Sequence, residues 1–349
     1  MTAGEVASEV RQGVALFDMS SRGVIEVAGE DRERWLDGML SNHVAALGEG
    51  SERSGCYALL LTPKGRIVAD FRVLWRESSY WLETRRDAVA GVIERLERYI
   101  IADDVRLMDR SADFDRLGVE GPGAGALLAR AAGRDPGLAR DACADLAIGD
   151  LQVVVAAFGW SGESGYQLFA AVGEGERVVG ALESAAASGL SRPDPEALEI
   201  LRIEAGIPML GAELDEEVLP AEAHLDRAIS TTKGCYTGQE IVARLRSRGQ
   251  VNHLLVGLRF AEGEGLPAEG EKLVAGERET GELTSVCRSA AAGPIGLGYV
   301  RREHAVPGTQ LLAGDLRASV SVLPFVALPE ERSPPGGGAA AARVGPRRG

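Results

Sequence analysis

The pattern of apolar residues changes along the chain, and this change limits the folds that the chain can adopt. Up to about residue 250, short apolar runs typical of strands alternate with runs whose apolar residues recur at helical spacing. After Gln250 the runs are short and rich in glycine, as at 253–260, 281–287, 295–300 and 316–323. Such runs predict a small β barrel or sandwich. We therefore expect a mixed α and β region followed by a separate β unit.

The first hundred residues contain the clearest local signals. Apolar runs at 56–61 and 67–75 flank Thr62-Pro-Lys-Gly-Arg66, whose proline and glycine favour a turn, so this segment predicts a β-hairpin. Asp31 is expected to open an amphipathic helix, and the apolar spacing over 87–101 predicts another. Strand and helix signals thus alternate from the beginning of the sequence.

Composition argues against several classes of function. The formal net charge is −14 over 349 residues, which argues against broad binding of nucleic acid or anionic lipid. No apolar run approaches the roughly 20 residues that cross a membrane. The first twelve residues carry acids where an export signal needs cations. We expect a cytoplasmic protein without a membrane partner.

The cysteines, at positions 56, 143, 235 and 287, are widely spaced. They form no Cys-x-x-Cys pair and have no histidine nearby at metal-ligand spacing, so we predict no metal site. Without an export signal, such cysteines are expected to be reduced thiols rather than disulfides.

Residues Gly121-Pro-Gly-Ala-Gly-Ala126 satisfy the dinucleotide-binding pattern G-x-G-x-x-A and follow a possible strand at 117–119. That strand is short and has polar neighbours, unlike a buried parallel strand. We favour the alternative interpretation, a Pro-Gly turn that starts a helix.

The segment Lys233-Gly-Cys-Tyr-Thr-Gly-Gln-Glu240 contains the most informative cysteine. Thr237 and Glu240 have the spacing of a capping box, which predicts a helix start at Thr237. Cys235 precedes this cap by two residues and follows Lys233 by two, so the helix dipole and the ammonium would both favour its thiolate. Cys235 is therefore either a reactive thiol or a small buried apolar residue.

This eight-residue segment resembles the signature of the YgfZ-type folate-binding proteins. These are similar in fold to the glycine cleavage T-protein, a folate-dependent aminomethyltransferase whose equivalent segment generally lacks the cysteine. The resemblance extends through Phe17-Asp-Met-Ser20, Thr62-Pro-Lys-Gly-Arg66, Ser161-Gly-Glu-Ser-Gly-Tyr166 and Leu201-Arg-Ile-Glu-Ala-Gly206.

The resemblance implies an α+β fold with three parts. Residues 1–250 would form two interwoven α/β folate-binding units of the T-protein type, and residues 251–328 a small C-terminal β barrel. Residues 329–349 are mostly Pro, Gly, Ala and Arg, which predicts a disordered tail.

Four residues are candidates for contact with folate, namely Tyr166, Glu204, Lys233 and Asp70. Glu204 lies in the last turn of a predicted helix, where a carboxylate gains nothing from the helix dipole. The resemblance makes it the acceptor of the pterin's donor pair, and the alternative is a surface acid, exposed or paired with Arg202. Tyr166 is similar to a folate-contacting tyrosine, with a core aromatic as the alternative. Lys233 would neutralise the glutamate tail of folate or activate Cys235.

Asp70 matches the position of the catalytic aspartate of the T-protein, although Ala69 replaces the acid that precedes it. Three roles stay open for Asp70: a catalytic group, a hydrogen-bonding ligand of folate, and a structural turn acid. We expect any chemistry of the protein to rest on Cys235 and Asp70.

The resemblance implies a tetrahydrofolate-binding protein that supports iron-sulfur cluster assembly or repair through Cys235. The expected cofactor is tetrahydrofolate or a one-carbon derivative, and the expected partners are iron-sulfur client or assembly proteins. One alternative is a folate-dependent aminomethyl or methyl transferase, to which Asp70 points. Another is a binding or scaffold protein in which Cys235 is inert.

Overall fold

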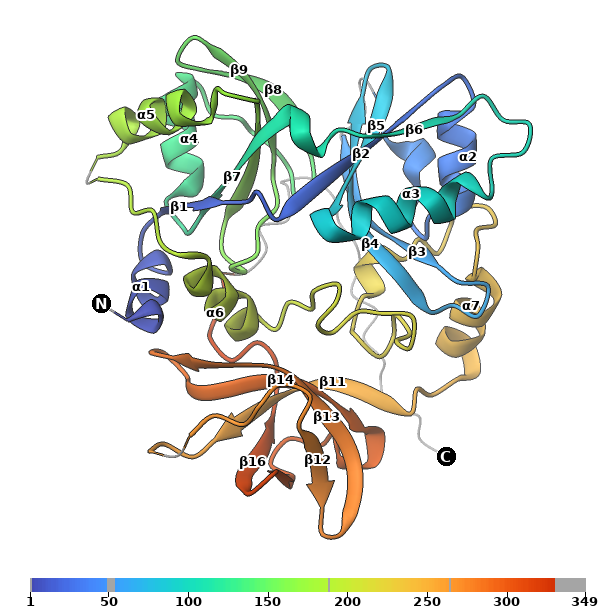
Figure 1. The fold of residues 1–349 in the computed structure, drawn as a ribbon, viewed down its shortest axis with the longest axis vertical. Coiled ribbons are helices and arrows are strands. Elements are labelled where there is room, and N and C mark those ends of the chain that lie inside the picture. The colour runs from blue at the N-terminus through green and yellow to red at the C-terminus, as the bar shows by residue number, and fades with distance from the viewer. Residues whose placement is uncertain (1, 49–53, 188, 264, 330–349) are drawn as a thin grey trace, which may run out of the picture.

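The computed structural model describes residues 2–48, 54–187, 189–263 and 265–329. Over these ranges the chain forms two five-stranded sheets and a closed six-stranded barrel, joined by helices and long loops (Figure 1). The two sheets lie side by side above the barrel in this view.

Sheet one has the strand order β1-β7-β10-β9-β8. Its strands are β1 (Ala15–Asp18), β7 (Phe114–Glu120), β8 (Cys143–Ile148), β9 (Leu151–Ala156) and β10 (Gly165–Ala171). Helices α4 (Ala124–Ala132) and α5 (Gly175–Ala185) cover its outer face, where Leu127 and Leu182 join a core that includes Val119. The apolar residues on one side of each helix thus pack against the strand side chains that point to the outer face, which are every second residue of a strand.

Sheet two has the strand order β3-β4-β5-β2-β6. Its strands are β2 (Arg22–Ala28), β3 (Gly55–Leu61), β4 (Ile67–Arg76), β5 (Ser79–Arg85) and β6 (Arg106–Asp109). Helices α2 (Arg32–Met39) and α3 (Val89–Glu97) pack on its outer face, with Leu36 and Leu96 against Phe71 and Leu82. Each sheet therefore has a helix-covered outer face and a free inner face.

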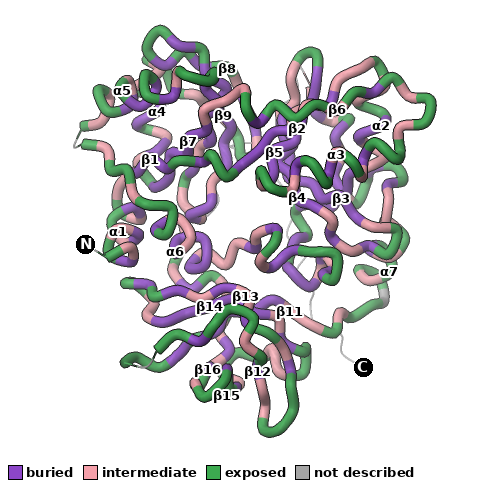
Figure 2. Tube along the Cα trace, viewed as in Figure 1, coloured by how far each residue is buried: buried purple, intermediate pink, exposed green. Residues whose placement is uncertain are grey.

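The two inner faces meet in the middle of the molecule. Val24 and Leu74 of sheet two share an apolar core with Val154 and Phe169 of sheet one, and Figure 2 shows buried positions along the strands of both sheets. The chain supplies β1 to sheet one, builds all of sheet two, and then returns to sheet one with β7. The two units are thus interwoven, as expected.

The barrel completes the fold. Its strands are β11 (His253–Phe260), β12 (Lys272–Ala275), β13 (Arg278–Ser289), β14 (Gly293–Arg301), β15 (Gln310–Ala313) and β16 (Leu316–Ser321). Helices α1 (Ala3–Val10) and α6 (Pro195–Ala205) lie between sheet one and the barrel, and α7 (Gln239–Arg248) leads into β11 (Figure 1).

The predicted fold class is confirmed. The hairpin pairs β3 with β4 around the Thr62–Arg66 turn, and α6 ends at Gly206, whose φ of 66° is the left-handed conformation expected of a helix-ending glycine. The boundaries 1–250 and 251–328 stay predictions, and residues 330–349 of the predicted tail lie outside the described residues. None of the helices in the described part of the chain has both the length and the apolarity that a membrane crossing needs.

The favoured interpretation of the G-x-G-x-x-A segment agrees with the structure. A strand and a helix do flank it, namely β7 and α4. However, β7 pairs antiparallel with both of its neighbours, β1 and β10. A dinucleotide fingerprint needs a parallel βαβ unit, so Gly121–Ala126 is a turn that leads into a helix.

Candidate functional site

Asp70 lies on the inner face of sheet two, in the middle of β4. Phe71 and Val73 pack into the outer core, so Asp70 and Arg72 point toward sheet one. The Asp70 side chain is buried, its Oδ2 accepts a hydrogen bond of 3.0 Å from the Tyr57 hydroxyl, and its Oδ1 has no partner in the structure. Burial raises the pKa of Asp70, although the charges of Arg22 and Arg72 oppose this shift.

A second buried carboxylate, Glu83, holds two arginines in the same space. Arg22 donates to both of its oxygens, at 2.7 and 3.0 Å, and Arg116 of sheet one approaches within 3.5 Å. Burial disfavours the charged form of Glu83, but the attraction of Arg22 and Arg116 prevails and lowers its pKa. Burial lowers the pKa of Arg116 to about 10. Charged side chains of both sheets, Arg22 and Glu83 of sheet two and Arg116 of sheet one, therefore lie together in the space between the sheets.

Glu120 is a further buried carboxyl of this space, at the end of β7. It accepts hydrogen bonds from the Trp160 and Ser161 amides, the Ser161 hydroxyl and the Gln167 side chain. Burial raises the pKa of Glu120 to about 7, although the hydrogen bonds from Ser161 and from the Trp160 amide act to lower it. A Cβ on Gly159 would lie 2.4 Å from the carboxylate, so only glycine fits at that position.

We call this group of buried polar side chains the inner layer. It consists of Arg22, Tyr57, Asp70, Arg72, Glu83, Arg116, Glu120, Trp160 and Gln167. Among the described residues, eight buried side-chain atoms have no hydrogen-bond partner, and the inner layer contains six of them. They are Asp70 Oδ1, Arg72 Nε, Arg116 Nε and Nη1, Trp160 Nε1 and Gln167 Oε1, whereas the other two belong to Arg32 and Thr84.

These six atoms make the inner layer the candidate binding site, because a bound molecule or ordered water would have to supply their missing partners. Each buried polar group without a partner costs about 1–3 kcal/mol, and such groups are rare in folded proteins. Four of the six are donors and two are acceptors, so a flat polar molecule with both kinds of group along its edge would satisfy them. The layer therefore has the chemistry of a binding site for a polar heterocycle.

A cavity of the described chain lies outside the inner layer. It has a volume of about 580 Å³ and opens between α1, α4 and the segment before α6, lined by residues such as Val10, Gly123 and Leu190. Arg130, one of its charged side chains, donates to the Ala185 carbonyl. None of the eight unpaired buried atoms lines this cavity, so its size alone does not make it a candidate site.

Glu204 is not part of the inner layer. Its carboxylate accepts hydrogen bonds from Arg11 at the end of α1, at 2.6 Å, and from Ser289 of the barrel. Arg11 also pairs with Glu163 at 3.1 Å. Glu204 therefore joins α1, α6 and the barrel, and it shares no hydrogen-bond partner with Asp70 among the described residues.

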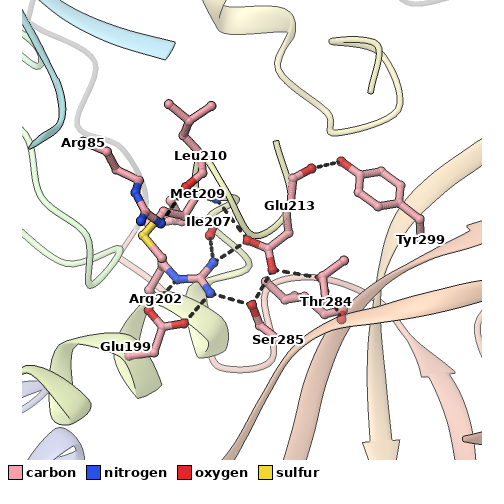
Figure 3. Close-up of polar contacts among 11 residues, drawn as sticks. Arg85, Glu199, Arg202, Ile207, Met209, Leu210, Glu213, Thr284, Ser285 and Tyr299 are labelled. Carbon is pink, nitrogen blue, oxygen red and sulfur yellow. Dashed lines mark hydrogen bonds and ion pairs between the residues drawn. The ribbon is translucent and has the colours of Figure 1, made fainter. Parts of the chain in front are cut away.

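The expected alternative partner of Glu204, Arg202, belongs to a different group. Arg202 donates to Glu199 and Glu213, and Glu213 also accepts from Thr284 and Ser285 of β13 (Figure 3). We call these five residues the junction cluster. Every nitrogen of the Arg202 guanidinium and both oxygens of Glu213 have partners. The cluster fastens α6 and the loop after it to the barrel.

Tyr166 points to the opposite face of sheet one from Gln167. Its ring packs against the core under α4, and its hydroxyl is 3.3 Å from where a Cβ on Gly125 would lie. Tyr166 thus packs, partly buried, on the face of sheet one that points away from Asp70, and its contact with folate stays a prediction.

Lys233 also has a structural position. Its ammonium donates to the carbonyls of Asp37, Leu40 and Asn42, at the C-terminal end of α2, and pairs with the Asp37 carboxylate at 3.2 Å. These contacts use all three N–H groups of the ammonium and offset the negative end of the helix dipole. The structure therefore does not place Lys233 as the partner of Cys235 or of a folate tail.

Cys235 is exposed, whereas Cys56, Cys143 and Cys287 are buried, and none of these four described cysteines forms a disulfide. The predicted helix start at Thr237 is wrong. Helix α7 begins at Gln239, its N-cap is Gly238 with a φ of 85°, and no side chain caps it. Gly238 packs tightly against the 62–66 turn: a Cβ there would lie 2.7 Å from the Thr62 carbonyl, so this position requires glycine.

The structure thereby brings the two signature segments together. Gly238 and Gly65 pack against each other, and Ile241 of α7 lies over Gly65. The Thr237 amide donates to the Gly38 carbonyl of α2. The loop that carries Cys235 is thus held by the 62–66 turn and by α2, at the outer side of sheet two.

Comparison with known proteins identifies the family. Residues 2–233 match the GCVT N-terminal domain, and residues 254–326 match the glycine cleavage T-protein C-terminal barrel domain. The chain therefore belongs to the glycine cleavage T-protein family.

Named relatives and a solved structure agree with this assignment. The aminomethyltransferase of Streptomyces avermitilis is 31% identical over 327 residues, which cover 92% of this chain and 87% of the relative. That of Rubrobacter xylanophilus is 31% identical and covers 95% and 87%. A putative chloroplastic transferase of Arabidopsis thaliana is 28% identical and covers 90% and 72%. The fold is similar to that of the glycine cleavage aminomethyltransferase T of Bartonella henselae, with a TM-score of 0.80, 23% identity, and coverage of 93% and 89%.

Several residues of the site could not be recognised in the sequence. Arg22, Glu83 and Arg116 are ordinary charged residues of strands, and Glu120 precedes a glycine turn. The local pattern gives no distinct signal for them, because the same strands carry other charged residues, such as Glu26, Arg85 and Asp115.

Proposed function

We propose that this protein binds tetrahydrofolate and supports iron-sulfur cluster assembly or repair in client proteins through Cys235. The observation that carries the proposal is the position of Cys235. It is the exposed thiol of the four, on a loop that Lys233 and the 62–66 turn hold in place. An exposed thiol on a fixed loop is suited to act on another protein.

The inner layer is the part of the chain that fits folate. The pterin ring of folate presents N–H donors beside a carbonyl acceptor, and the layer offers unpaired acceptors on Asp70 and Gln167 and unpaired donors on Arg72, Arg116 and Trp160. When bound, tetrahydrofolate would supply a carrier for one-carbon groups. The relatives named aminomethyltransferase support this choice of ligand.

The cysteine role is tested in cells that lack the protein. Cys235→Ala should fail to restore the activity of iron-sulfur enzymes, while its folate affinity and free energy of unfolding match those of the wild type. Thr231→Ala, an exposed change in the same loop, is the matched control and should restore activity fully. Full restoration by Cys235→Ala would exclude a role for this thiol.

Aminomethyl transfer is the second candidate function, and the buried Asp70 beside Tyr57 favours it. The test is formation of methylene-tetrahydrofolate from an aminomethyl donor. Turnover that is lost in Asp70→Asn but retained in Cys235→Ala would establish the transferase. Intact folate binding without turnover would support the folate-binding function and exclude aminomethyl transfer.

A further inference from the structure

Glu120 and Gln167 face each other in the inner layer, on neighbouring strands of sheet one. Glu120 ends β7 and Gln167 lies in β10, and both side chains are fully buried. Gln167 Nε2 donates to Glu120 Oε1 at 3.4 Å, whereas Gln167 Oε1 has no partner in the structure. The nitrogen end of this amide is therefore hydrogen-bonded and the oxygen end is not.

The Glu120 carboxyl group is held by donors on both of its oxygens. Oε1 also accepts from the Trp160 amide at 3.0 Å, and Oε2 accepts from the Ser161 amide and hydroxyl at 3.2 and 2.6 Å. Gly165 packs against the same group, and a Cβ there would lie 2.8 Å from Oε2. These contacts fix the direction in which the carboxyl group faces Gln167.

When ionised, Glu120 also fixes the orientation of the Gln167 amide. A carboxylate has no hydrogen to donate, so only the nitrogen end of the amide can bond to it. Turning the amide over would lose this hydrogen bond and bury two acceptors against each other. Gly118 and Met19 pack closely beside the amide, since a Cβ on Gly118 would lie 3.2 Å from Gln167 Nε2 and 3.1 Å from Met19 Cγ. The Gln167 oxygen is therefore the end that remains for a ligand.

A neutral side chain at position 120 would not fix the amide in this way. A glutamine there would carry both a donor and an acceptor, so it could bond to either end of Gln167. If its nitrogen bonded to the Gln167 oxygen, the Gln167 nitrogen would be left for the ligand. The inner layer would then present a donor where it now presents an acceptor.

We propose that Glu120 is a positioning residue that sets the hydrogen-bonding preference of the inner layer through Gln167. The carboxylate keeps the Gln167 oxygen available, so the layer accepts at this point an N–H group of the bound heterocycle. Without this control a donor of the ligand would meet a donor of the protein, which costs affinity. The inference rests on the proposed folate binding, and it adds a residue that acts on the ligand through its neighbour.

The test measures the affinity of the full-length protein for 5-formyl-tetrahydrofolate by calorimetric titration. The titration is run at about pH 8, above the pKa of about 7 that burial gives Glu120. Glu120→Gln should weaken binding at least about tenfold. Gln167→Met should weaken it by a similar factor, because it removes the same acceptor. Urea denaturation establishes that each variant folds.

Exchange of the two groups separates positioning from a structural role. In the double variant Glu120→Gln/Gln167→Glu, the new amide donates to the new carboxylate, whose second oxygen is left for the ligand. Affinity should return to within about threefold of the wild type. If Glu120 acted only on the packing of its own surroundings, the second substitution would not restore binding.

The matched control is Glu222→Gln, which changes a buried carboxylate outside the inner layer. Glu222 accepts from the Leu219 amide at 2.9 Å and lies 3.5 Å from Arg66. This variant should bind 5-formyl-tetrahydrofolate as tightly as the wild type does.

The outcomes separate this inference from the proposed function. If the wild type does not bind 5-formyl-tetrahydrofolate, folate binding is wrong and the inference falls with it. If the wild type binds and Glu120→Gln binds equally well, folate binding stands and the positioning role is overturned. A loss in Glu120→Gln that persists in the double variant also overturns it. Should Glu120→Gln fail to fold, equally weak binding by Gln167→Met and the double variant would overturn it.

Discussion

The protein contains two buried groups of charged residues that differ in how completely they are hydrogen-bonded. In the junction cluster, every guanidinium nitrogen of Arg202 and both carboxylate oxygens of Glu213 have partners. In the inner layer, Arg116 reaches Glu83 with one nitrogen at 3.5 Å and leaves the other two without a partner. The completed group fastens parts of the chain together, and the incomplete one is available to a ligand.

The largest expected effect comes from the junction cluster. Arg202→Met should lower the free energy of unfolding by about 3–5 kcal/mol, because it leaves the buried Glu213 carboxylate without its cation. Denaturation by urea measures the change. Arg192→Gln, which breaks an exposed pair with Glu176, is the control and should cost less than about 1 kcal/mol. Equal losses in the two variants would remove the distinction between the junction cluster and an ordinary surface pair.

Glu120 should give the inner layer a pH dependence. Its pKa is about 7 in the folded protein and 4.5 ordinarily, so the folded state binds this proton more tightly than the unfolded chain. The free energy of unfolding should therefore fall by about 3 kcal/mol as pH rises from about 4.5 to 8. Glu120→Gln should flatten this part of the profile when unfolding is measured at several pH values. A slope unchanged by the substitution would show that Glu120 does not titrate in this range.

An Arg→Met substitution in the inner layer should change the free energy of unfolding less than Arg202→Met does. Arg116→Met removes a buried cation with two unpaired nitrogens while Glu83 keeps Arg22 as a partner. The free energy of unfolding should change by less than about 1 kcal/mol or increase, and folate affinity should fall about tenfold. Urea denaturation and calorimetric titration of 5-formyl-tetrahydrofolate measure the two quantities. A loss of stability as large as that of Arg202→Met would place Arg116 among the structural residues.

The smallest expected effect concerns the cysteines. Cys235→Ser should change the free energy of unfolding by no more than about 0.5 kcal/mol, because the side chain is exposed. In the native wild type, iodoacetamide should modify Cys235 before Cys56, Cys143 and Cys287, which need local unfolding to react. Peptide mass spectrometry over time measures the order of modification, and early modification of Cys287 would contradict it.

The sequence alone predicted the elements whose signals are local. The hairpin around residues 62–66, the helix that ends at Gly206 and four of the six barrel strands, β11, β13, β14 and β16, follow from turn residues and apolar spacing. Strands β12 and β15 were not predicted. The resemblance of the 233–240 segment led to the fold class, which the structure confirms. The roles expected of Asp70 and Cys235 stay predictions. The structure places Asp70 in β4, where it is buried, and Cys235 on the exposed loop before α7.

Tertiary structure alone decided which side chains meet. Tyr166 and Gln167 are neighbours in sequence but face opposite sides of sheet one. Lys233 donates hydrogen bonds to carbonyls at the end of a helix almost two hundred residues earlier in the chain. The capping box predicted at Thr237 does not form, and the N-cap residue, Gly238, packs against a turn that is distant in sequence. Local signals depend on residues a few positions apart, whereas the inner layer gathers residues from Arg22 to Gln167. Their proximity depends on which faces of the two sheets pack together, and that choice is made only when the whole chain folds.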